Sequence, residues 1–263
     1  MRIIEVKKDI AAKIINCDVK DLNKKDIKNI KKTLNKFGII FFLNQKLKPK
    51  DYIEFAKKLG KLAKYPRLKG LNKKFPHITV VERKKSDKGP SFGEQFHTDS
   101  SYTKSPPKFT MLFSKKVPKP GLANTEFSSQ YLAYKALTPN LKKKLSSIFG
   151  IYSSDGPIAV TTLERTKEKG SLKKELVSKH KLIKMIEGRK TIYCSPGHLL
   201  DFSGKFKGNV RLKKYLNKHQ IRKKFQFSLR WYKNQLAIWD NRSMLHQATP
   251  FKGSRVMHRI TIL

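Results

Sequence analysis

The C-terminal part of the chain restricts the fold most, because three strand-length apolar segments lie close together there. These segments are residues 225–231, 236–239 and 256–263. Short runs rich in β-branched and aromatic residues are typical of strands. The end of the chain therefore predicts a β-rich core, with His246 in the stretch that connects its last two segments.

The predicted helices lie mainly before this region. An edge strand is expected within residues 1–15, and apolar residues then recur with helical spacing over residues 26–37, where Gly38 ends the pattern. A continuous apolar run at residues 39–43 predicts a strand that is buried on both faces. A second helix is expected over residues 49–59, with proline at its start and glycine after its end.

In the middle of the chain, short strands and short helices are predicted. Strands are predicted at residues 78–81, 109–113, 125–127 and 191–194, short helices after Ser128 or Ser129 and after Thr138, and a basic helix at residues 210–219. The polar segment 153–175 is expected to leave the fold as an excursion or lid. Helices early and strands later indicate an α+β protein, mainly β, built as a jelly roll or barrel with flanking helices.

Length and composition restrict the class of protein. A chain of 263 residues is long enough for one core, so a single domain over residues 1–263 is expected. There is neither a membrane-spanning apolar run nor an N-terminal leader pattern. Cys17 and Cys194 are too far apart in sequence to form a paired metal motif, so free thiols and a cytoplasmic location are expected.

The net charge of +41 permits two interpretations. A field of this size attracts nucleic acid, anionic lipid or acidic substrates. However, the 49 lysines are spread along the whole chain and form neither a stripe nor a tail, which favours a general compositional bias. Nucleic-acid binding therefore remains the alternative, and a small-molecule substrate is the preferred partner. Self-association into a homo-oligomer stays open.

The 11 arginines are more informative than the lysines. From Arg230 onward the chain contains four arginines and only two lysines, which inverts the ratio of the rest of the sequence. A planar guanidinium binds a carboxylate through two parallel hydrogen bonds, which an ammonium cannot do. The C-terminal arginines Arg255 and Arg259 are therefore candidates for binding an anionic ligand.

His97 and Asp99 form the second candidate motif. Residues i and i+2 of an extended segment point to the same face, so the imidazole and the carboxylate can approach one metal ion. A His-x-Asp triplet alone is a weak signal. It gains weight because His246 follows about 150 residues later and Arg255 comes nine residues after that. Two histidines and one carboxylate leave three positions of an Fe(II) ion open, as in non-haem oxygenases.

In this order the motifs resemble the TauD/TfdA family of Fe(II)/2-oxoglutarate-dependent dioxygenases, which includes taurine and phenoxyacetate dioxygenases. The resemblance covers nearly the whole chain and rests on residues 38–42, 55–60, 96–99, 106–107, 125, 188–193, 230–231, 237–242, 246 and 255–259. It implies a double-stranded β-helix, that is, a cupin-like jelly roll with helices packed outside.

The resemblance also implies the role of each residue. Fe(II) would be held by His97, Asp99 and His246, and 2-oxoglutarate would chelate the metal through its keto acid end. Arg255 would bind the distal carboxylate with a hydrogen bond added by Thr125. Arg259 would contact the primary substrate or support the cosubstrate. The implied reaction consumes O2, hydroxylates the substrate and releases succinate and CO2.

The substrate is less well defined by the sequence. Tyr65, Leu68 and Gly93 stand where taurine enzymes carry other residues, so the expectation is a small anion such as a sulfonate, phosphonate or carboxylate, with a taurine-like compound included. His198 could be a pocket residue or an ordinary loop histidine, and Trp239 is expected in the core. The competing functions are an Fe(II)/2-oxoglutarate demethylase acting on nucleic acid and a basic nucleic-acid-binding protein without catalysis.

Overall fold

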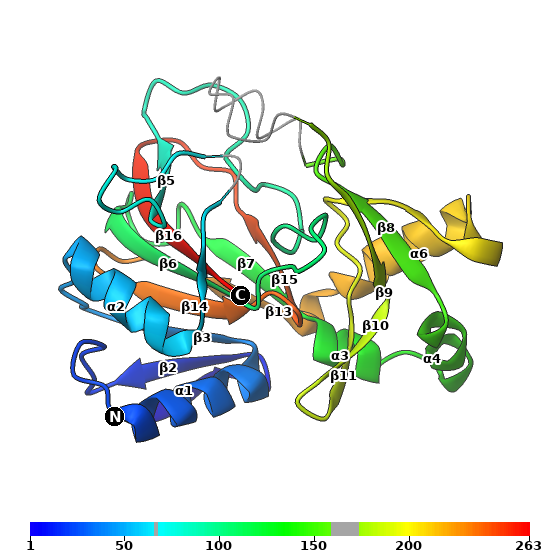
Figure 1. Cartoon of the computed structure of the whole chain (residues 1–263), viewed down its shortest axis with the longest axis horizontal. Coiled ribbons are helices and arrows are strands. Elements are labelled where there is room, and N and C mark those ends of the chain that lie inside the picture. Colours follow the sequence, from blue (N-terminus) through cyan, green and yellow to red (C-terminus); the bar gives the residue numbers. More distant parts are fainter. Residues whose placement is uncertain (66–67, 159–173) are drawn as a thin grey trace.

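Two β-sheets that enclose an apolar core form the centre of the molecule, and helices flank them (Figure 1). The computed structural model describes residues 1–65, 68–158 and 174–263. The architecture is the predicted one, a mainly β jelly roll with external helices.

The larger sheet has the strand order β1-β2-β3-β14-β6-β16-β4, with β5 also paired to β16. All its pairings are antiparallel except that of β2 with β3. Its strands are β1 (Arg2–Lys7), β2 (Ala11–Ile15), β3 (Ile39–Phe42), β4 (Leu62–Ala63), β5 (Thr79–Arg83), β6 (Phe109–Lys116), β14 (Leu236–Asp240) and β16 (Arg255–Ile262).

The smaller sheet of the jelly roll has the order β13-β7-β15. Its strands are β7 (Thr125–Ser129), β13 (Gln226–Leu229) and β15 (Met244–Ala248). The register of β15 on β7 places His246 opposite Phe127 and Ala248 opposite Thr125. These residues consequently share the inner face of the sheet, toward the core between the two sheets.

Helices α1 (Lys24–Phe37) and α2 (Pro49–Leu59) cover the outer face of the larger sheet (Figure 1). The Asn23 side chain caps α1, and Gly38 ends it with a positive φ of 83°. A side chain at Gly38 would collide with Met244, since an added Cβ would lie 2.5 Å from its sulfur. Both predicted helices are confirmed to within two residues.

A second group of elements packs beside the jelly roll around its own apolar cluster (Figure 1). It contains the sheets β12-β8-β9 and β10-β11 and the helices α3, α4 and α6. The elements are β8 (Phe149–Ser153), β9 (Val177–Lys181), β10 (Ile183–Ile186), β11 (Arg189–Ile192), β12 (Leu199–Phe202), α3 (Gln130–Lys135), α4 (Pro139–Ser146) and α6 (Val210–Gln220), with 3-10 turns η1 (Gly204–Phe206) and η2 (Lys223–Phe225).

Strand alternation decides which side chains of the larger sheet reach the inside. On β6, Phe109, Met111 and Phe113 belong to the cluster under the helices, whereas Leu112 belongs to the inner cluster. On β16, Ile260 and Ile262 face the helices. Because side chains alternate between faces, Thr110 on β6 and Arg255 and Arg259 on β16 point inward.

Several sequence expectations differ from the structure in detail. The N-terminal edge strand is a hairpin of β1 and β2. Strand β15 was not predicted, although it carries His246. Of the predicted lid, residues 159–173 lie outside the described residues, and its two ends meet where the Ser154 amide donates to the Leu176 carbonyl at 2.9 Å. No helix in the described ranges is long and apolar enough to cross a membrane.

Candidate metal centre and its pocket

His97, Asp99 and His246 meet at one point inside the jelly roll, as the sequence predicts. All three are buried, and one potential ligand atom from each lies within 4.8 Å of the others. His97 and His246 form an isolated antiparallel bridge, with reciprocal backbone hydrogen bonds of 3.0 Å and 2.8 Å. The bridge joins the segment before β6 to β15 and holds the two imidazole centroids 4.3 Å apart.

The orientation of His97 suits a metal ligand. Its Nδ1 lies 2.6 Å from the Gln95 carbonyl oxygen, which can only accept, so Nδ1 carries the hydrogen and Nε2 keeps its lone pair. Gly93 adopts a positive φ of 79° close to the ring, and a Cβ there would lie 3.2 Å from Cε1. A larger residue at position 93 would press on the imidazole, which explains why glycine suits this position.

The Asp99 carboxylate uses its two oxygens differently. Oδ2 accepts a 2.6 Å hydrogen bond from Thr110, whereas Oδ1 lies 3.8 Å from Nε2 of His97 and 3.7 Å from Nε2 of His246. Nη2 of Arg259 is also 3.0 Å from Oδ1. Burial alone would raise the pKa of Asp99, but Arg259, the histidines and the Thr110 hydrogen bond outweigh it and hold the pKa well below its usual range.

Burial has the opposite effect on the two histidines. It lowers the pKa of His97 and lowers that of His246 well below its ordinary value, and the nearby positive charge of Arg259 acts in the same direction. Both rings are therefore neutral near pH 7, which is the form that binds metal. Two neutral imidazoles and one ionised carboxylate form a donor set that suits a divalent iron ion.

A pocket extends from this cluster toward β16. Its walls combine apolar side chains with the two predicted arginines and Thr125, and it is lined by Val81, Phe92, Gly93, His97, Asp99, Leu112, Thr125, Trp239, His246, Ala248, Arg255 and Arg259. The structure thus brings together every site residue that the sequence singled out. Trp239, which was expected only in the core, packs there and also lines this pocket.

Arg255 lies at one end of the pocket. It is 5% exposed, donates to the Ala123 carbonyl at 3.4 Å and stacks on Phe251 with its guanidinium carbon 4.8 Å from the ring centroid. Phe251 also contacts Arg83, the cross-strand partner of Arg255 on β5. The nearby Thr125 hydroxyl accepts a 3.0 Å hydrogen bond from Trp231, so its own hydrogen is available for another acceptor.

Arg259 contacts the cluster of His97, Asp99 and His246 directly, through the Asp99 carboxylate. Besides the contact with Asp99, its guanidinium carbon lies 4.1 Å from the centroid of the Tyr65 ring. Nη1 is buried and makes no hydrogen bond to the described part of the chain. Tyr65, one of the positions at which the sequence differs from taurine enzymes, is therefore in contact with a residue that lines the pocket.

His198 also approaches the cluster. It is buried, and its ring packs edge-on against His97, with centroids 6.1 Å apart, and against Tyr102 at 5.0 Å.

The other two C-terminal arginines lie outside the pocket lining. Arg242 forms a 2.6 Å ion pair with Asp240, and Arg230 is exposed. Sequence reasoning missed Thr110, because a threonine inside a predicted strand carries no signal of its neighbours.

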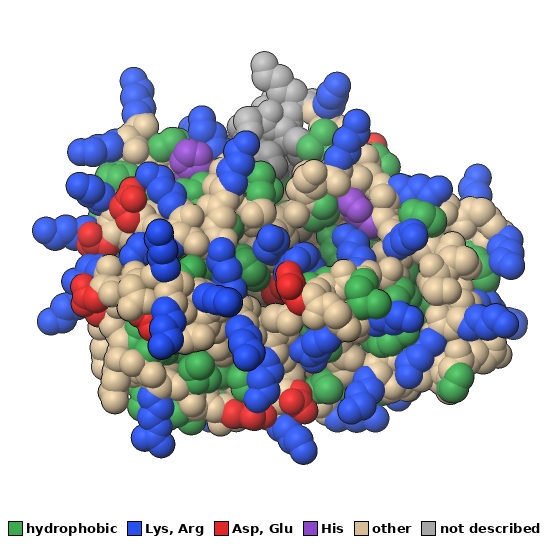
Figure 2. Space-filling view, turned by 60° about the horizontal axis from the view of Figure 1, so that its bottom comes forward, with side chains coloured by type: hydrophobic (Ala, Val, Ile, Leu, Met, Phe, Trp, Pro, Cys, Tyr) green, Lys and Arg blue, Asp and Glu red, His purple; other side chains and the backbone are tan. Residues whose placement is uncertain are grey.

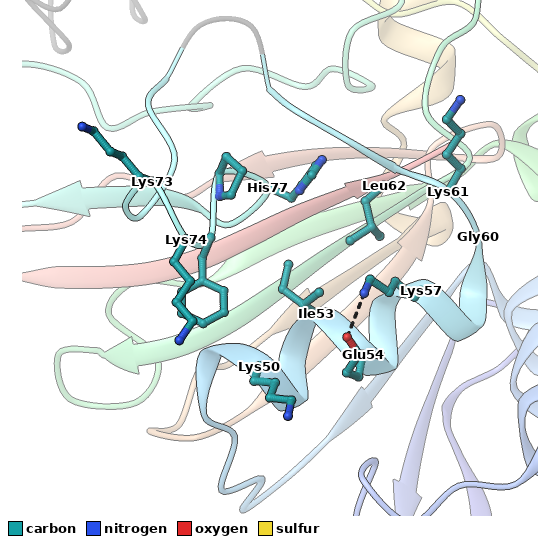
Figure 3. A pocket seen from close by; sticks show the side chains of 12 residues that line it. Lys50, Ile53, Glu54, Lys57, Gly60, Lys61, Leu62, Lys73, Lys74 and His77 are labelled. Atoms are coloured by element: carbon teal, nitrogen blue, oxygen red, sulfur yellow. Dashed lines mark hydrogen bonds and ion pairs between the residues drawn. The ribbon is translucent and has the colours of Figure 1, made fainter.

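The surface charge does not form a single channel on the face shown in Figure 2, where Lys and Arg side chains lie over all parts of the surface. A separate groove between α2 and residues 73–77 is lined by five lysines, Lys50, Lys57, Lys61, Lys73 and Lys74 (Figure 3). Its lining includes the apolar Ile53 and Leu62, and none of His97, Asp99 and His246 belongs to it. On the face shown, the basic side chains are spread over the surface. The compositional interpretation of the net charge stays a prediction.

Fold and site together define a class: a jelly roll that places two imidazoles and one carboxylate beside a pocket with buried arginines is typical of non-haem iron enzymes. Comparison with known protein families identifies the family within this class. The family model described as "Taurine catabolism dioxygenase TauD, TfdA family" matches residues 3–261, and the chain belongs to this family. It is accordingly an Fe(II)- and 2-oxoglutarate-dependent dioxygenase by class.

Individual relatives are distant but extend over most of the chain. A protein of Schizosaccharomyces pombe named as an alpha-ketoglutarate-dependent sulfonate dioxygenase is 24% identical, over 97% of this chain and 67% of its own length. The alpha-ketoglutarate-dependent 2,4-dichlorophenoxyacetate dioxygenase of Cupriavidus pinatubonensis is 24% identical over 96% and 94%. Alpha-ketoglutarate is another name for 2-oxoglutarate.

Solved structures share the fold. A taurine dioxygenase from Burkholderia xenovorans superposes with a TM-score of 0.82 at 21% identity, covering 99% of this chain and 88% of that one. The protein AAD-2, solved in complex with Mn(II) and N-oxalylglycine, gives a TM-score of 0.81 at 20% identity, with 99% and 96% covered. These similarities confirm the predicted jelly roll.

Proposed function

We propose that His97, Asp99 and His246 hold Fe(II) and that the chain hydroxylates a small anionic organic substrate. The observation that carries the proposal is the convergence of these three buried side chains from separate segments, with neutral imidazoles and an ionised carboxylate. Iron bound there would supply the oxidation chemistry, in which O2 and 2-oxoglutarate are consumed and succinate and CO2 are released.

The cosubstrate end of the site is assigned to Arg255 and Thr125. Both line the same pocket as the three ligands, and both are buried. A guanidinium and a hydroxyl hydrogen are the donors that a terminal carboxylate of 2-oxoglutarate needs. The Trp231 hydrogen bond supports this role for Thr125, because it leaves the hydroxyl hydrogen free to point into the pocket.

The primary substrate is assigned to the part of the pocket next to Arg259. The buried Nη1 of Arg259 supports an anionic group on the substrate, such as a sulfonate, phosphonate or carboxylate, because it has no acceptor among the described residues. Val81, Phe92 and Leu112 provide apolar walls that suit a short carbon skeleton and exclude water from the reacting bond. Free cysteines at 17 and 194 fit a reducing compartment and support a cytoplasmic location.

A substrate panel tests this function directly. The Fe(II)-loaded protein would be incubated with 2-oxoglutarate and O2 together with sulfonates, phosphonates, carboxylates or quaternary amines, and succinate release would be measured. Stimulation by at least one of the three anionic classes is expected, with little by the amines. Stimulation by the amines alone would refute the anionic substrate. No binding of 2-oxoglutarate to the Fe(II)-loaded protein would refute the dioxygenase function itself.

The same assay separates the two arginines. Arg259→Gln is expected to raise the KM for the primary substrate more than the KM for 2-oxoglutarate, because it removes the donor next to the substrate part of the pocket. The opposite ratio would assign Arg259 to the cosubstrate.

A further inference from the structure

A chain of three buried hydrogen bonds leads from Trp239 to the Asp99 carboxylate. Nε1 of Trp239 donates to Oδ1 of Asn241 at 3.0 Å, Nδ2 of Asn241 donates to Oγ1 of Thr110 at 2.8 Å, and Oγ1 of Thr110 donates to Oδ2 of Asp99 at 2.6 Å. All four residues are at most 6% exposed. The chain links β14, the turn that follows it and β6 to the loop that carries Asp99.

The direction of every bond in this chain follows from the first donor. An indole nitrogen can only donate, so the atom of Asn241 that faces Trp239 has to be the amide oxygen. The amide nitrogen of Asn241 then faces Thr110 and donates to its hydroxyl oxygen. The remaining hydroxyl hydrogen of Thr110 is thereby directed at Asp99, which as an ionised carboxylate can only accept.

The chain gives the two carboxylate oxygens of Asp99 separate tasks. Oδ2 is held by the Thr110 hydroxyl, while Oδ1 faces both imidazoles and Arg259. A carboxylate that is free to rotate would present either oxygen or both to a metal. One that is anchored through Oδ2 presents Oδ1 alone, which preserves open positions on the ion for the cosubstrate and O2.

The same chain reaches the second histidine. The Trp239 ring packs against His246, with centroids 4.7 Å apart, so one side chain contacts one ligand and begins the hydrogen-bond chain to another. The backbone of Asn241 is held as well, because its amide donates to the Lys108 carbonyl at 2.9 Å and its carbonyl accepts from the Thr98 hydroxyl. The Asn241 backbone is thus fixed to the segment of His97 and Asp99 and to the residue that precedes β6.

We propose that Thr110 and Asn241 are positioning residues for the metal centre, and that their hydrogen-bond chain holds Asp99 as a ligand through Oδ1 alone. This inference rests on the proposed function, because it assumes that the cluster binds a divalent metal. Neither residue contacts the ion or the substrate, so their effect is expected on metal affinity and coordination before it appears in turnover.

The test measures Mn(II) binding to the full chain without 2-oxoglutarate, by the loss of the free-ion EPR signal. Thr110→Val removes the hydroxyl at nearly constant volume and is expected to weaken Mn(II) binding about 10- to 100-fold, the usual cost of losing an outer hydrogen bond to a ligand. Thr110→Ser keeps the hydroxyl and should remain within about threefold of the unmodified chain, less than the value of one neutral hydrogen bond. Asn241→Asp should weaken binding at least as much as Thr110→Val, because its new oxygen competes with Asp99 for the Thr110 hydrogen.

Thr261→Val is the matched control. Thr261 lies directly opposite Thr110 on β16, is buried, and its hydroxyl has no hydrogen-bond partner in the described ranges. The Thr261→Val variant should bind Mn(II) with unchanged affinity. Melting temperatures of the metal-free variants separate a merely structural role: if Thr110→Val lowers the melting temperature but binds Mn(II) as tightly as the unmodified chain, the inference is overturned and the proposed function stands. If the unmodified chain itself binds no Mn(II), the metal site of the proposed function is refuted first.

Discussion

The two ends of the pocket are held in place by different forces. At the ligand end, directional hydrogen bonds fix the groups: Gln95 holds His97, Thr110 holds Asp99, and a backbone bridge joins the two histidine segments. At the other end, Arg255 rests on the Phe251 ring and makes a longer hydrogen bond of 3.4 Å to a carbonyl. The first end is organised for one geometry, whereas the second is a buried positive charge between packed side chains.

This difference predicts how each end tolerates substitution. A metal site depends on several ligands acting on one ion, so loss of any one of them removes the whole function. A carboxylate-binding end depends on the sum of a charge, a hydroxyl and apolar contacts, so loss of one part reduces affinity gradually.

The largest effect is expected at the three ligands. Replacing His97, Asp99 or His246 with alanine should abolish the weak visible absorption band that Fe(II) and 2-oxoglutarate give together under anaerobic conditions, because chelation requires the intact donor set. His77→Ala, which changes a histidine outside the pocket, should leave the band unchanged. An intact band in any of the three ligand variants would mean that the ligand is misassigned.

A graded effect is expected at Arg255. Arg255→Lys retains the charge but replaces the two parallel donors by a point charge, and should raise the KM for 2-oxoglutarate about 10- to 100-fold, the range of a charged hydrogen bond. The turnover number at saturating cosubstrate should change much less. Arg230→Lys, an exposed substitution, is the control. A KM equal to that of the unmodified chain would remove Arg255 from cosubstrate binding.

A smaller effect is expected at Thr125 and its partner Trp231. Thr125→Val should raise the KM for 2-oxoglutarate about 2- to 10-fold, the range of one neutral hydrogen bond. Trp231→Phe should act in the same direction, because the Thr125 hydroxyl then loses the donor that orients its hydrogen toward the pocket. In the double variant, the factor by which the KM for 2-oxoglutarate rises should be smaller than the product of the two single factors. Fully independent effects would contradict the proposed coupling through the 3.0 Å hydrogen bond.

The smallest effect is expected at the lysine groove of Figure 3. Replacing Lys73 and Lys74 together with alanine should leave the kcat/KM for 2-oxoglutarate unchanged, because these exposed side chains line a groove that contains none of the ligands. Binding of a DNA or RNA oligonucleotide should be weak, and salt should abolish it. Tight, salt-resistant binding lost in this double variant would instead favour the nucleic-acid alternative.

Local sequence determined the helices better than the short strands. The spacing of apolar residues and the terminal proline and glycine located α1 and α2, since helix formation depends on near neighbours. The short strands β8, β9, β10 and β12 were missed, because their pairing depends on residues far away in the chain. Strand β15 was missed for the same reason, although its histidine was recognised.

The sequence by itself supplied the candidate residues: residue type and order, together with the family resemblance, selected His97, Asp99, His246, Arg255 and Arg259, because few residue types can bind a metal or a carboxylate. Only the tertiary structure decided which uncharged residues support them. Thr110 and Asn241 are 131 positions apart and meet through the register of β14 on β6. Such a contact depends on long-range strand pairing, which no local pattern specifies, and it directs Oδ1 of Asp99 toward the two histidines.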